Sequence, residues 1–362
     1  MGKYDYQEEA AQNVINATLS SGKAILAMAC GGGKTTVSQL IIKKYIQAKG
    51  ENSKILVITE NNNALKDQYL AELNNSNTPI TFTFGEIDTD KNVQVRVGVA
   101  ASLHKLPWDE VDLILCDEAH RHYRKKRVQD FLKSILVRYE ILFTGTPAKF
   151  IKDNESKDEK IKIVFISGVD LQKKDIYSGV DLDVIRSHNK KDPIKTINCL
   201  FTHAKKVNAN LSKTLLVCPT INYAESVAQY LAAIGKTVFL STSKNDCDNQ
   251  ILNESKSWCK SKVASECFIV TVRKCSLGYN DPSVTTSADL CSSTGSLCNN
   301  QQVFARILRA SPDSLRKFYF RFSSLDSKSY NEQVVMLIKL KAYMGSEVFS
   351  GFNGKNLELT RG

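Results

Sequence analysis

Residues 24–36, AILAMACGGGKTT, constrain what this chain can fold into more than any other stretch. The apolar run Ala24–Met28 predicts a short buried strand, and a glycine loop separates it from a helix that begins near Lys34 and ends at Gly50. This arrangement wraps backbone N–H groups around the phosphates of a nucleotide. We therefore expect Lys34 to reach the β- and γ-phosphates and the hydroxyl of Thr35 to bind Mg²⁺.

The three glycines of this loop, Gly31, Gly32 and Gly33, would let the main chain approach the phosphates. The start of the helix, up to Thr36, would add partial positive charge. The pattern departs from the full G-x-x-x-x-G-K-T form because Met28 stands where the first glycine is expected. Taken alone, the stretch is also compatible with a glycine turn before an unrelated helix.

The composition indicates ordinary globular cores and an excess of positive charge. A length of 362 residues favours two domains, and a hydrophobic content of 42% is enough for sizeable cores. The formal charge of +11 favours a polyanionic partner such as nucleic acid, although a soluble basic protein without such a partner can carry the same charge.

The ten cysteines are scattered and predict no metal centre. No C-x-x-C pair occurs, and Cys291 and Cys298 lack neighbouring ligands, so we expect reduced core cysteines such as Cys116, Cys218 and Cys267. The charged N-terminus is no secretion signal, and no apolar stretch is long enough to span a bilayer. These features predict a cytoplasmic protein, and the Asn- and Lys-rich composition suits an AT-rich bacterial or phage genome.

Strands and helices alternate through the first half of the chain. Strands are predicted at 54–60, 93–99, 111–116 and 139–144, and helices at 6–20, 34–50 and 62–73. Such alternation predicts a parallel sheet with helices on both faces. Gln7 lies at the start of the first helix, where its side-chain amide can pair with the edge of adenine, although in isolation a surface glutamine at a helix start is the better interpretation.

Two adjacent acids, Asp117 and Glu118, follow the apolar strand 111–116. In an open α/β sheet, ligands gather at the carboxyl ends of the strands, which places this pair beside the phosphate loop. We expect Asp117 to complete the Mg²⁺ shell and Glu118 to orient and deprotonate the attacking water. A plain turn with two acids is the alternative.

The motifs Tyr6-Gln7, GGGKT, LILCDEAH and FTGTP, in this order, resemble those of superfamily 2 helicases of the DEAH-box type. A weaker resemblance links the chain to compact phage or bacterial DNA helicases and to type III restriction motor domains. The resemblance implies an α/β fold with two tandem RecA-like P-loop domains, each a mainly parallel sheet with helices on both faces. It also implies ATP and Mg²⁺ as cofactors.

The second half of the chain carries the motifs that this resemblance requires. Residues 278–282, GYNDP, resemble the fifth motif of the family, and residues 302–309, QVFARILR, resemble its Q-x-x-G-R-x-x-R motif with Ala305 in place of the glycine. Arg306 and Arg309 are three residues apart and would share one face of a helix. Their guanidinium groups could then clamp the γ-phosphate and stabilise the charge that develops during its transfer, although two surface arginines are the simpler interpretation.

The domain boundaries follow from these motifs. We expect an ATP-binding domain at 1–150, a connecting segment at 151–195, a helicase C-terminal domain at 196–345 and a tail at 346–362. Within the connecting segment, 162–171 and 181–185 are interpreted as strands. ATP is expected to lie between the two domains, which would close on binding and reopen on hydrolysis.

Further residues are assigned to coupling and to nucleic-acid binding. The coupling residues would relay the state of the phosphate to the nucleic acid, and they are His120, Thr144, Thr146, Gly278, Asn280 and Gln302. The expected phosphate-backbone contacts are Thr59, Ser102 and Thr271, for which an ordinary strand-end cap is an equally good interpretation. The basic run 121–127, RHYRKKR, is either a solvated helix face or a nucleic-acid contact in which Tyr123 stacks on a base.

The sequence thus predicts an ATP-dependent helicase or translocase of low sequence specificity. It would act as a monomer on nucleic acid, with DNA preferred over RNA. An RNA helicase, the motor subunit of a restriction system, and a nucleic-acid-binding regulator with a degenerate ATPase remain as alternatives.

Overall fold

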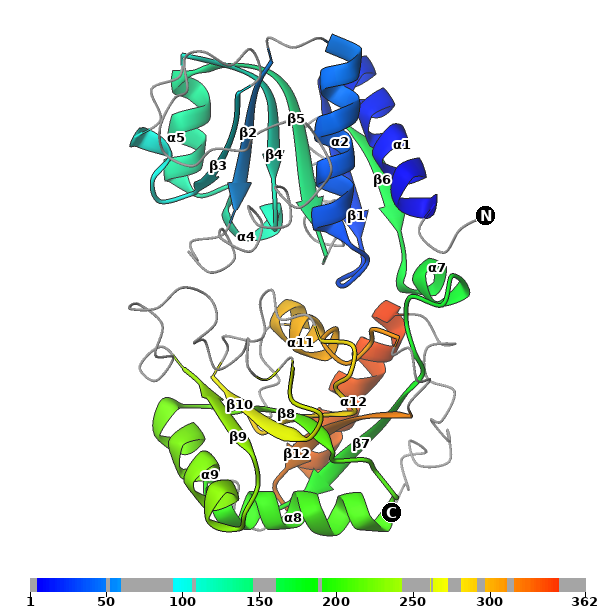
Figure 1. The fold of residues 1–362 in the computed structure, drawn as a ribbon, viewed down its shortest axis with the longest axis vertical. Helices are drawn as coiled ribbons and strands as arrows, with labels where there is room; N and C mark the ends of the chain where they lie inside the picture. Colours follow the sequence, from blue (N-terminus) through cyan, green and yellow to red (C-terminus); the bar gives the residue numbers. More distant parts are fainter. Residues whose placement is uncertain are drawn as a thin grey trace. The chain divides into compact units, whose positions relative to one another are not determined.

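In the computed structural model, the described residues are 5–49, 53–59, 94–105, 109–145, 161–187, 191–242, 261, 263–272, 281–291, 297–310 and 316–344. The chain divides into two compact units, Met1–Ser167 and Gly168–Gly362. Each unit has its own six-stranded sheet (Figure 1).

The first unit is an α/β layer structure around a sheet of order β3-β2-β4-β5-β1-β6. Every strand pair in it is parallel. Its elements are α1 (Asp5–Ser21), β1 (Lys23–Met28), α2 (Lys34–Lys49), β2 (Lys54–Thr59), β3 (Gln94–Val99), the 3₁₀ turn η1 (Leu103–Lys105), β4 (Glu110–Cys116), α4 (Ala119–His122), α5 (Lys126–Ser134), β5 (Leu136–Thr144) and β6 (Lys162–Ile166).

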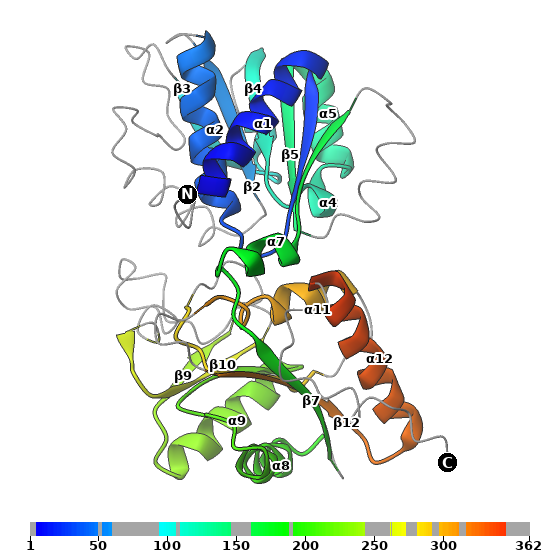
Figure 2. The ribbon, with the colours of Figure 1, turned by 90° about the vertical axis from the view of Figure 1, so that its right-hand side faces the viewer.

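Helices cover both faces of this sheet. Figure 2 shows α1 and α2 on one side and α4 and α5 on the other. On the second side, Val128 and Phe131 of α5 join a core with strand residues such as Ile58, Ile114 and Leu142. The central strands read as continuous apolar runs because both of their faces are buried. The predicted parallel sheet with helices on both faces is confirmed.

The second unit contains another all-parallel sheet, of order β7-β12-β11-β8-β10-β9. Its elements are α7 (Gly168–Lys173), β7 (Val180–Arg186), α8 (Pro193–Lys206), β8 (Lys213–Val217), α9 (Ile221–Ala233), β9 (Val238–Ser241), β10 (Cys267–Thr271), β11 (Thr286–Asp289), α11 (Leu297–Phe304), β12 (Lys317–Ser323) and α12 (Ser327–Met344).

The two faces of the second sheet have different partners. One face packs against α8 and α9 in a core that includes Phe318, Phe320 and Phe322 of β12. On the other side lie α11 and α12 (Figure 1). Because side chains alternate along a strand, the residues between these phenylalanines point to α11 and α12. All seven residues of β12 are buried.

The unit boundary falls after Ser167, inside the predicted connecting segment. Strand β6 belongs to the first sheet and β7 to the second. The predicted strand 162–171 is wrong beyond Ile166, because α7 begins at Gly168. The neighbouring strand β1 ends opposite Ile166, so a longer β6 would have no partner along that edge.

Several smaller sequence predictions are also tested by the fold. Cys116, Cys218 and Cys267 are buried free thiols, and burial raises the pKa of each. Among the described residues, none of the helices combines the length and apolar character needed to cross a bilayer.

Candidate active site

The loop between β1 and α2 adopts a conformation that its glycines make possible. Gly31 and Gly33 have φ values of 88° and 85°, in the left-handed region that side chains rarely adopt. A Cβ atom at Gly33 would lie 2.3 Å from Nε2 of Gln7. The amide of Val37 donates to the carbonyl of Gly33 at 3.0 Å. The backbone amides before Val37 in the first turn of α2 lie outside the helix's own hydrogen bonding and are directed at the loop.

Helix α1 supports this loop from one side. The hydroxyl of Tyr6 donates to the carbonyl of Gly32 at 2.7 Å, and the amide of Gln7 donates to the same carbonyl at 3.4 Å. Both side chains are buried. The Tyr6-Gln7 pair therefore fixes the phosphate loop, while the contact of Gln7 with adenine stays a prediction.

The lysine of the loop faces the acidic pair at the end of β4. Nζ of Lys34 lies 3.4 Å from Oε1 of Glu118. Glu118 is the N-cap of α4 and has left-handed backbone angles, φ 44° and ψ 44°, and its backbone amide donates to Oδ1 of Asp117 at 2.9 Å. Such a conformation is costly for a residue with a side chain and is typical of functional sites.

The carboxylate of Glu118 is charged and incompletely satisfied. Burial works to raise its pKa, but Lys34, with help from His120 and Arg121, outweighs burial and leaves the pKa below its ordinary value. Its Oε2 is buried and accepts no hydrogen bond within the part of the chain that the structure describes, although Nδ1 of His120 lies 3.5 Å away. A charged, buried oxygen of this kind can accept a hydrogen bond from a water molecule.

His120 links the acidic pair to the end of β5. Its Nδ1 lies 3.1 Å from Oγ1 of Thr144. Burial lowers the pKa of His120, although Glu118 opposes that effect, and the ring is therefore neutral at pH 7. The structure thus brings together Lys34 of GGGKT, Glu118 and His120 of LILCDEAH, and Thr144 of FTGTP.

Gly145, next to Thr144, approaches the phosphate loop more closely than a side chain would allow. A Cβ atom there would lie 2.5 Å from Sγ of Cys30 and 3.1 Å from Nζ of Lys34. The thiol of Cys30 also points to the carbonyl of Gly145 at 3.8 Å. Sequence reasoning noted FTGTP as a motif but gave no role to this glycine. In the sequence, the signal for a role of Gly145 is that GGGKT and FTGTP each place glycine at the end of a predicted strand.

The residues around the loop fit a nucleotide with its metal ion. The glycines leave a side-chain-free cradle at the N-terminus of α2. Thr35 and Asp117, both half-buried, supply a hydroxyl and a carboxylate, the oxygen ligands that Mg²⁺ prefers. Thr36 is exposed in the first turn of α2.

The second unit places the predicted arginines differently from the expectation. Arg306 and Arg309 do not share a helix face: α11 ends at Phe304, Arg306 lies in a turn, and Arg309 forms a β-bridge with Tyr177. The helix ends because the chain is drawn into extended pairing, in which the carbonyl of Leu308 accepts the amide of Ser178 at 2.8 Å. Gln302 is buried on α11.

The predicted nucleic-acid contacts lie at strand ends, with different exposure. Thr59 ends β2 and Thr271 ends β10, and both are buried, whereas Ser102 is partly exposed just after β3. The stacking role of Tyr123 is wrong, because its ring is buried and its hydroxyl donates to Glu140 at 2.5 Å and accepts from Lys23 at 2.6 Å. Thr146, Gly278 and Asn280 lie outside the described residues.

The chain is similar in sequence to one protein family and to several helicases. Residues 1–149 match the family model described as type III restriction enzyme, res subunit. The chain is 29% identical over 154 residues to an uncharacterized ATP-dependent helicase of Bacillus subtilis, YqhH, covering 39% of this chain and 26% of YqhH. It is 30% identical over 168 residues to the probable helicase A859L of African swine fever virus, covering 39% of this chain and 19% of A859L.

Solved structures resemble the chain over most of its length. The ATP-dependent type ISP restriction-modification enzyme LlaBIII bound to DNA has a TM-score of 0.69 at 17% identity, covering 95% of this chain and 30% of LlaBIII. Dbp5 of S. cerevisiae bound to RNA and ADP BeF3 has a TM-score of 0.64 at 13% identity, covering 95% and 92%. These likenesses concern the fold. The chain spans about a quarter or less of the two relatives found by sequence.

Proposed function

We propose that the chain is a DEAH-type ATP hydrolase that couples ATP turnover to movement on nucleic acid. The premise is that residues 1–149 carry a ResIII helicase-family domain and that the chain is consistent with a superfamily 2 helicase. The observation that carries this proposal is the side-chain array in the first unit, in which Lys34 lies 3.4 Å from Glu118, Glu118 lies 3.5 Å from His120, and His120 lies 3.1 Å from Thr144.

The chemistry follows from the charges of this array. Lys34 would bind the β- and γ-phosphates, and the amides of Gly31–Gly33 and of the first turn of α2 would bind the remaining phosphate oxygens. Mg²⁺, held by Thr35 and Asp117, would neutralise charge on the phosphates when bound. Glu118 would then exchange its ion pair with Lys34 for a water molecule and take its proton.

The second unit would complete the reaction. We propose that Arg306 and Arg309 stabilise the charge that develops on the transferred phosphoryl group. His120 and Thr144 would report the state of the phosphate within the first unit, and Thr146, Gly278, Asn280 and Gln302 would extend that coupling.

The nucleic-acid partner is proposed to be DNA in preference to RNA. The net charge of +11 supports a polyanionic partner, and contacts would be made to the phosphate backbone without reading sequence, with Ser102 as one contact. A second candidate function is the motor subunit of a restriction system. The family match of residues 1–149 and the similarity to LlaBIII favour it.

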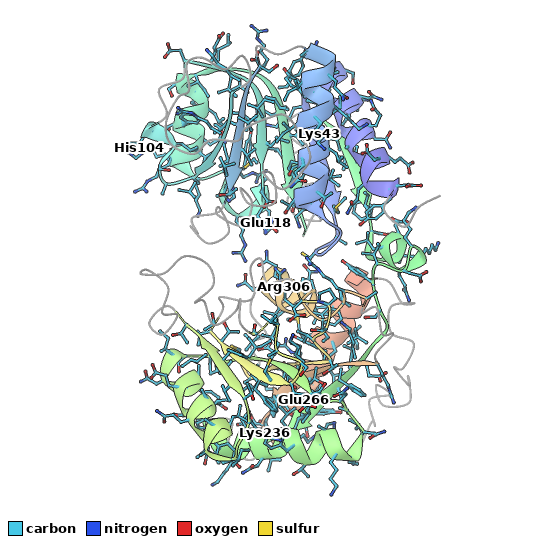
Figure 3. All side chains as sticks on the ribbon, viewed as in Figure 1. Lys43, His104, Glu118, Lys236, Glu266 and Arg306 are labelled. Atoms are coloured by element: carbon cyan, nitrogen blue, oxygen red, sulfur yellow. The ribbon has the colours of Figure 1, made fainter. Side chains whose placement is uncertain are left out.

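ATP turnover measured with single-stranded, duplex and branched DNA and with RNA tests the proposal. We expect nucleic acid to stimulate turnover, DNA more than RNA, and Lys34→Ala and Glu118→Gln to reduce it by about 100-fold or more. Lys43→Ala on the same helix is the matched control; both Lys43 and Glu118 are marked in Figure 3. Wild-type turnover that no nucleic acid changes would rule out the motor.

A further inference from the structure

One face of β12 contacts residues 300–309 of the second unit at their beginning, middle and end. Lys317, Tyr319 and Arg321 alternate along the strand and are each fully buried. They contact, in turn, the end, the middle and the beginning of residues 300–309. We call these ten residues the arginine segment because they include Arg306 and Arg309.

Arg321 holds the beginning of the arginine segment. Its Nη1 donates to Oδ1 of Asn300 on α11 at 2.7 Å and to Oδ2 of Asp289 on β11 at 2.9 Å, while its Nε donates to Oε1 of Gln333 on α12 at 2.8 Å. A buried guanidinium with three such partners joins two helices and two strands through charge-assisted hydrogen bonds.

Tyr319 holds the middle. Its ring packs edge-to-face on Phe304, with centroids 5.0 Å apart and planes at 63°. Phe304 is the last residue of α11 and is itself fully buried. This contact fixes the point at which the helix ends and the turn containing Arg306 begins.

Lys317 holds the end. Its ammonium donates to the carbonyl of Arg309 and to the carbonyl of Pro282, each at 2.7 Å. Pro282 closes the GYNDP motif, and its neighbour Asp281 is paired with the buried Lys213 at 2.8 Å. Lys317 therefore joins the last residues of two motifs that are 27 positions apart in the sequence.

The surroundings of Lys317 show that this position is costly for a cation. Burial lowers its pKa to about 8; Asp281 opposes the decrease and Arg309 adds to it. A neutral, apolar side chain of similar length would avoid that cost but would leave both carbonyls without this donor. Lys317 thus holds these two carbonyls in place although burial removes its ammonium group from water.

We propose that Lys317, Tyr319 and Arg321 are positioning residues that hold the arginine segment in the geometry from which Arg306 and Arg309 act on ATP. This inference rests on the proposed function. It assigns to β12 a role in setting the turnover rate rather than in binding the nucleotide, because the proposed phosphate-binding groups are in the first unit.

The test uses the full chain with Lys317→Met, and Lys339→Met on the exposed face of α12 as matched control. We expect hydrogen exchange of the amides of 305–310 to become at least about tenfold faster in Lys317→Met and to stay unchanged in the control. We also expect kcat with saturating DNA to fall by about tenfold to a hundredfold with KM for ATP unchanged. Lys317→Met combined with Arg306→Ala and Arg309→Ala should turn over ATP no more slowly than the Arg306→Ala/Arg309→Ala variant.

Asn300→Ala provides a second variant, because it cuts the tether of Arg321 to α11 and keeps the Arg321–Asp289 pair. If Lys317→Met does not fold, the same exchange and kinetic results are expected from Asn300→Ala. Unchanged exchange of 305–310 in the folded variant overturns the positioning role, whatever the ATPase results. Faster exchange together with a wild-type protein that hydrolyses no ATP would instead refute the proposed function, and a rise in KM at unchanged kcat would overturn the inferred role in turnover.

Discussion

At the scale of single residues, Gly145 shows how closely two motifs of the first unit approach. The missing side chain leaves room for Sγ of Cys30 and Nζ of Lys34. Cys30 is itself buried, so its thiol cannot move away from Gly145 without disturbing the core. The amino acid at position 145 is therefore set by the phosphate loop and not by the conformation of β5.

Gly145→Ala tests this close approach. The new methyl group should displace Cys30 or Lys34 and raise KM for ATP by about tenfold, since overpacking of this kind costs roughly 1–3 kcal/mol. Removing the thiol in Gly145→Ala/Cys30→Ala should recover most of the affinity. Affinity is measured by titration with a fluorescent ATP analogue, with Cys30→Ala alone as reference. An unchanged affinity for ATP in Gly145→Ala would show that the phosphate loop can accommodate a methyl group at position 145.

At the scale of elements, α4 carries a buried histidine next to the acidic pair. Both ring nitrogens of His122 are buried, and neither forms a hydrogen bond within the residues that the structure describes. Burial lowers its pKa to about 4; Lys125, His120 and Arg121 add to the decrease and Glu118 opposes it. The folded state therefore keeps His122 neutral at pH values where the unfolded chain already binds a proton.

This difference predicts acid sensitivity. The free energy of unfolding should fall as the pH drops from about 6.5 to 4, because the unfolded state takes up the proton first, and the loss by pH 4.5 should be about 2–3 kcal/mol. His122→Phe removes this contribution, so its Tm should fall by roughly 5–10 °C less than that of the wild type between pH 7.0 and 4.5. Circular dichroism measures both. Equal decreases in Tm would mean that His122 is protonated in the folded protein.

The sequence predicts elements best where pattern and chemistry agree. The strand, loop and helix around GGGKT and the strand before Asp117 are confirmed, because apolar runs and glycines leave few other structures possible. Strand β11 carries no such pattern: Thr286–Asp289 is mostly polar and wholly buried, with the hydroxyl of Thr286 donating to the carbonyl of Asn210 and Asp289 accepting from Arg321. For helix α8, the sequence does mark the helix start, because the N-cap residue Asp192 is followed by Pro193.

The arginine segment shows what local pattern cannot supply. A three-residue spacing predicts a shared helix face for Arg306 and Arg309, yet the helix ends at Phe304. The reason is tertiary: residues 176–178 pair with residues 308–310, and these contacts are invisible in the sequence spacing. Likewise, Tyr123 looks like an exposed aromatic among cations but fills the core beneath α5.

At the scale of the whole molecule, the excess of positive charge predicts salt-dependent binding of nucleic acid. Phosphate contacts release counterions, so raising the salt from 50 to 200 mM should weaken binding of a mixed-sequence single-stranded oligonucleotide by about tenfold or more, as expected for three or more contacts. Fluorescence anisotropy measures this, with oligonucleotides of different sequence as controls. Salt-independent or strongly sequence-selective binding would contradict backbone recognition.

The proposed coupling of the two units through one ATP is tested most directly by Arg306→Ala. With saturating DNA, the proposed mechanism predicts that this variant binds ATP with wild-type affinity, through the groups of the first unit, but turns it over at least about 100-fold more slowly. Turnover at the wild-type rate would contradict the mechanism, because the first unit would then hydrolyse ATP without the arginine of the second.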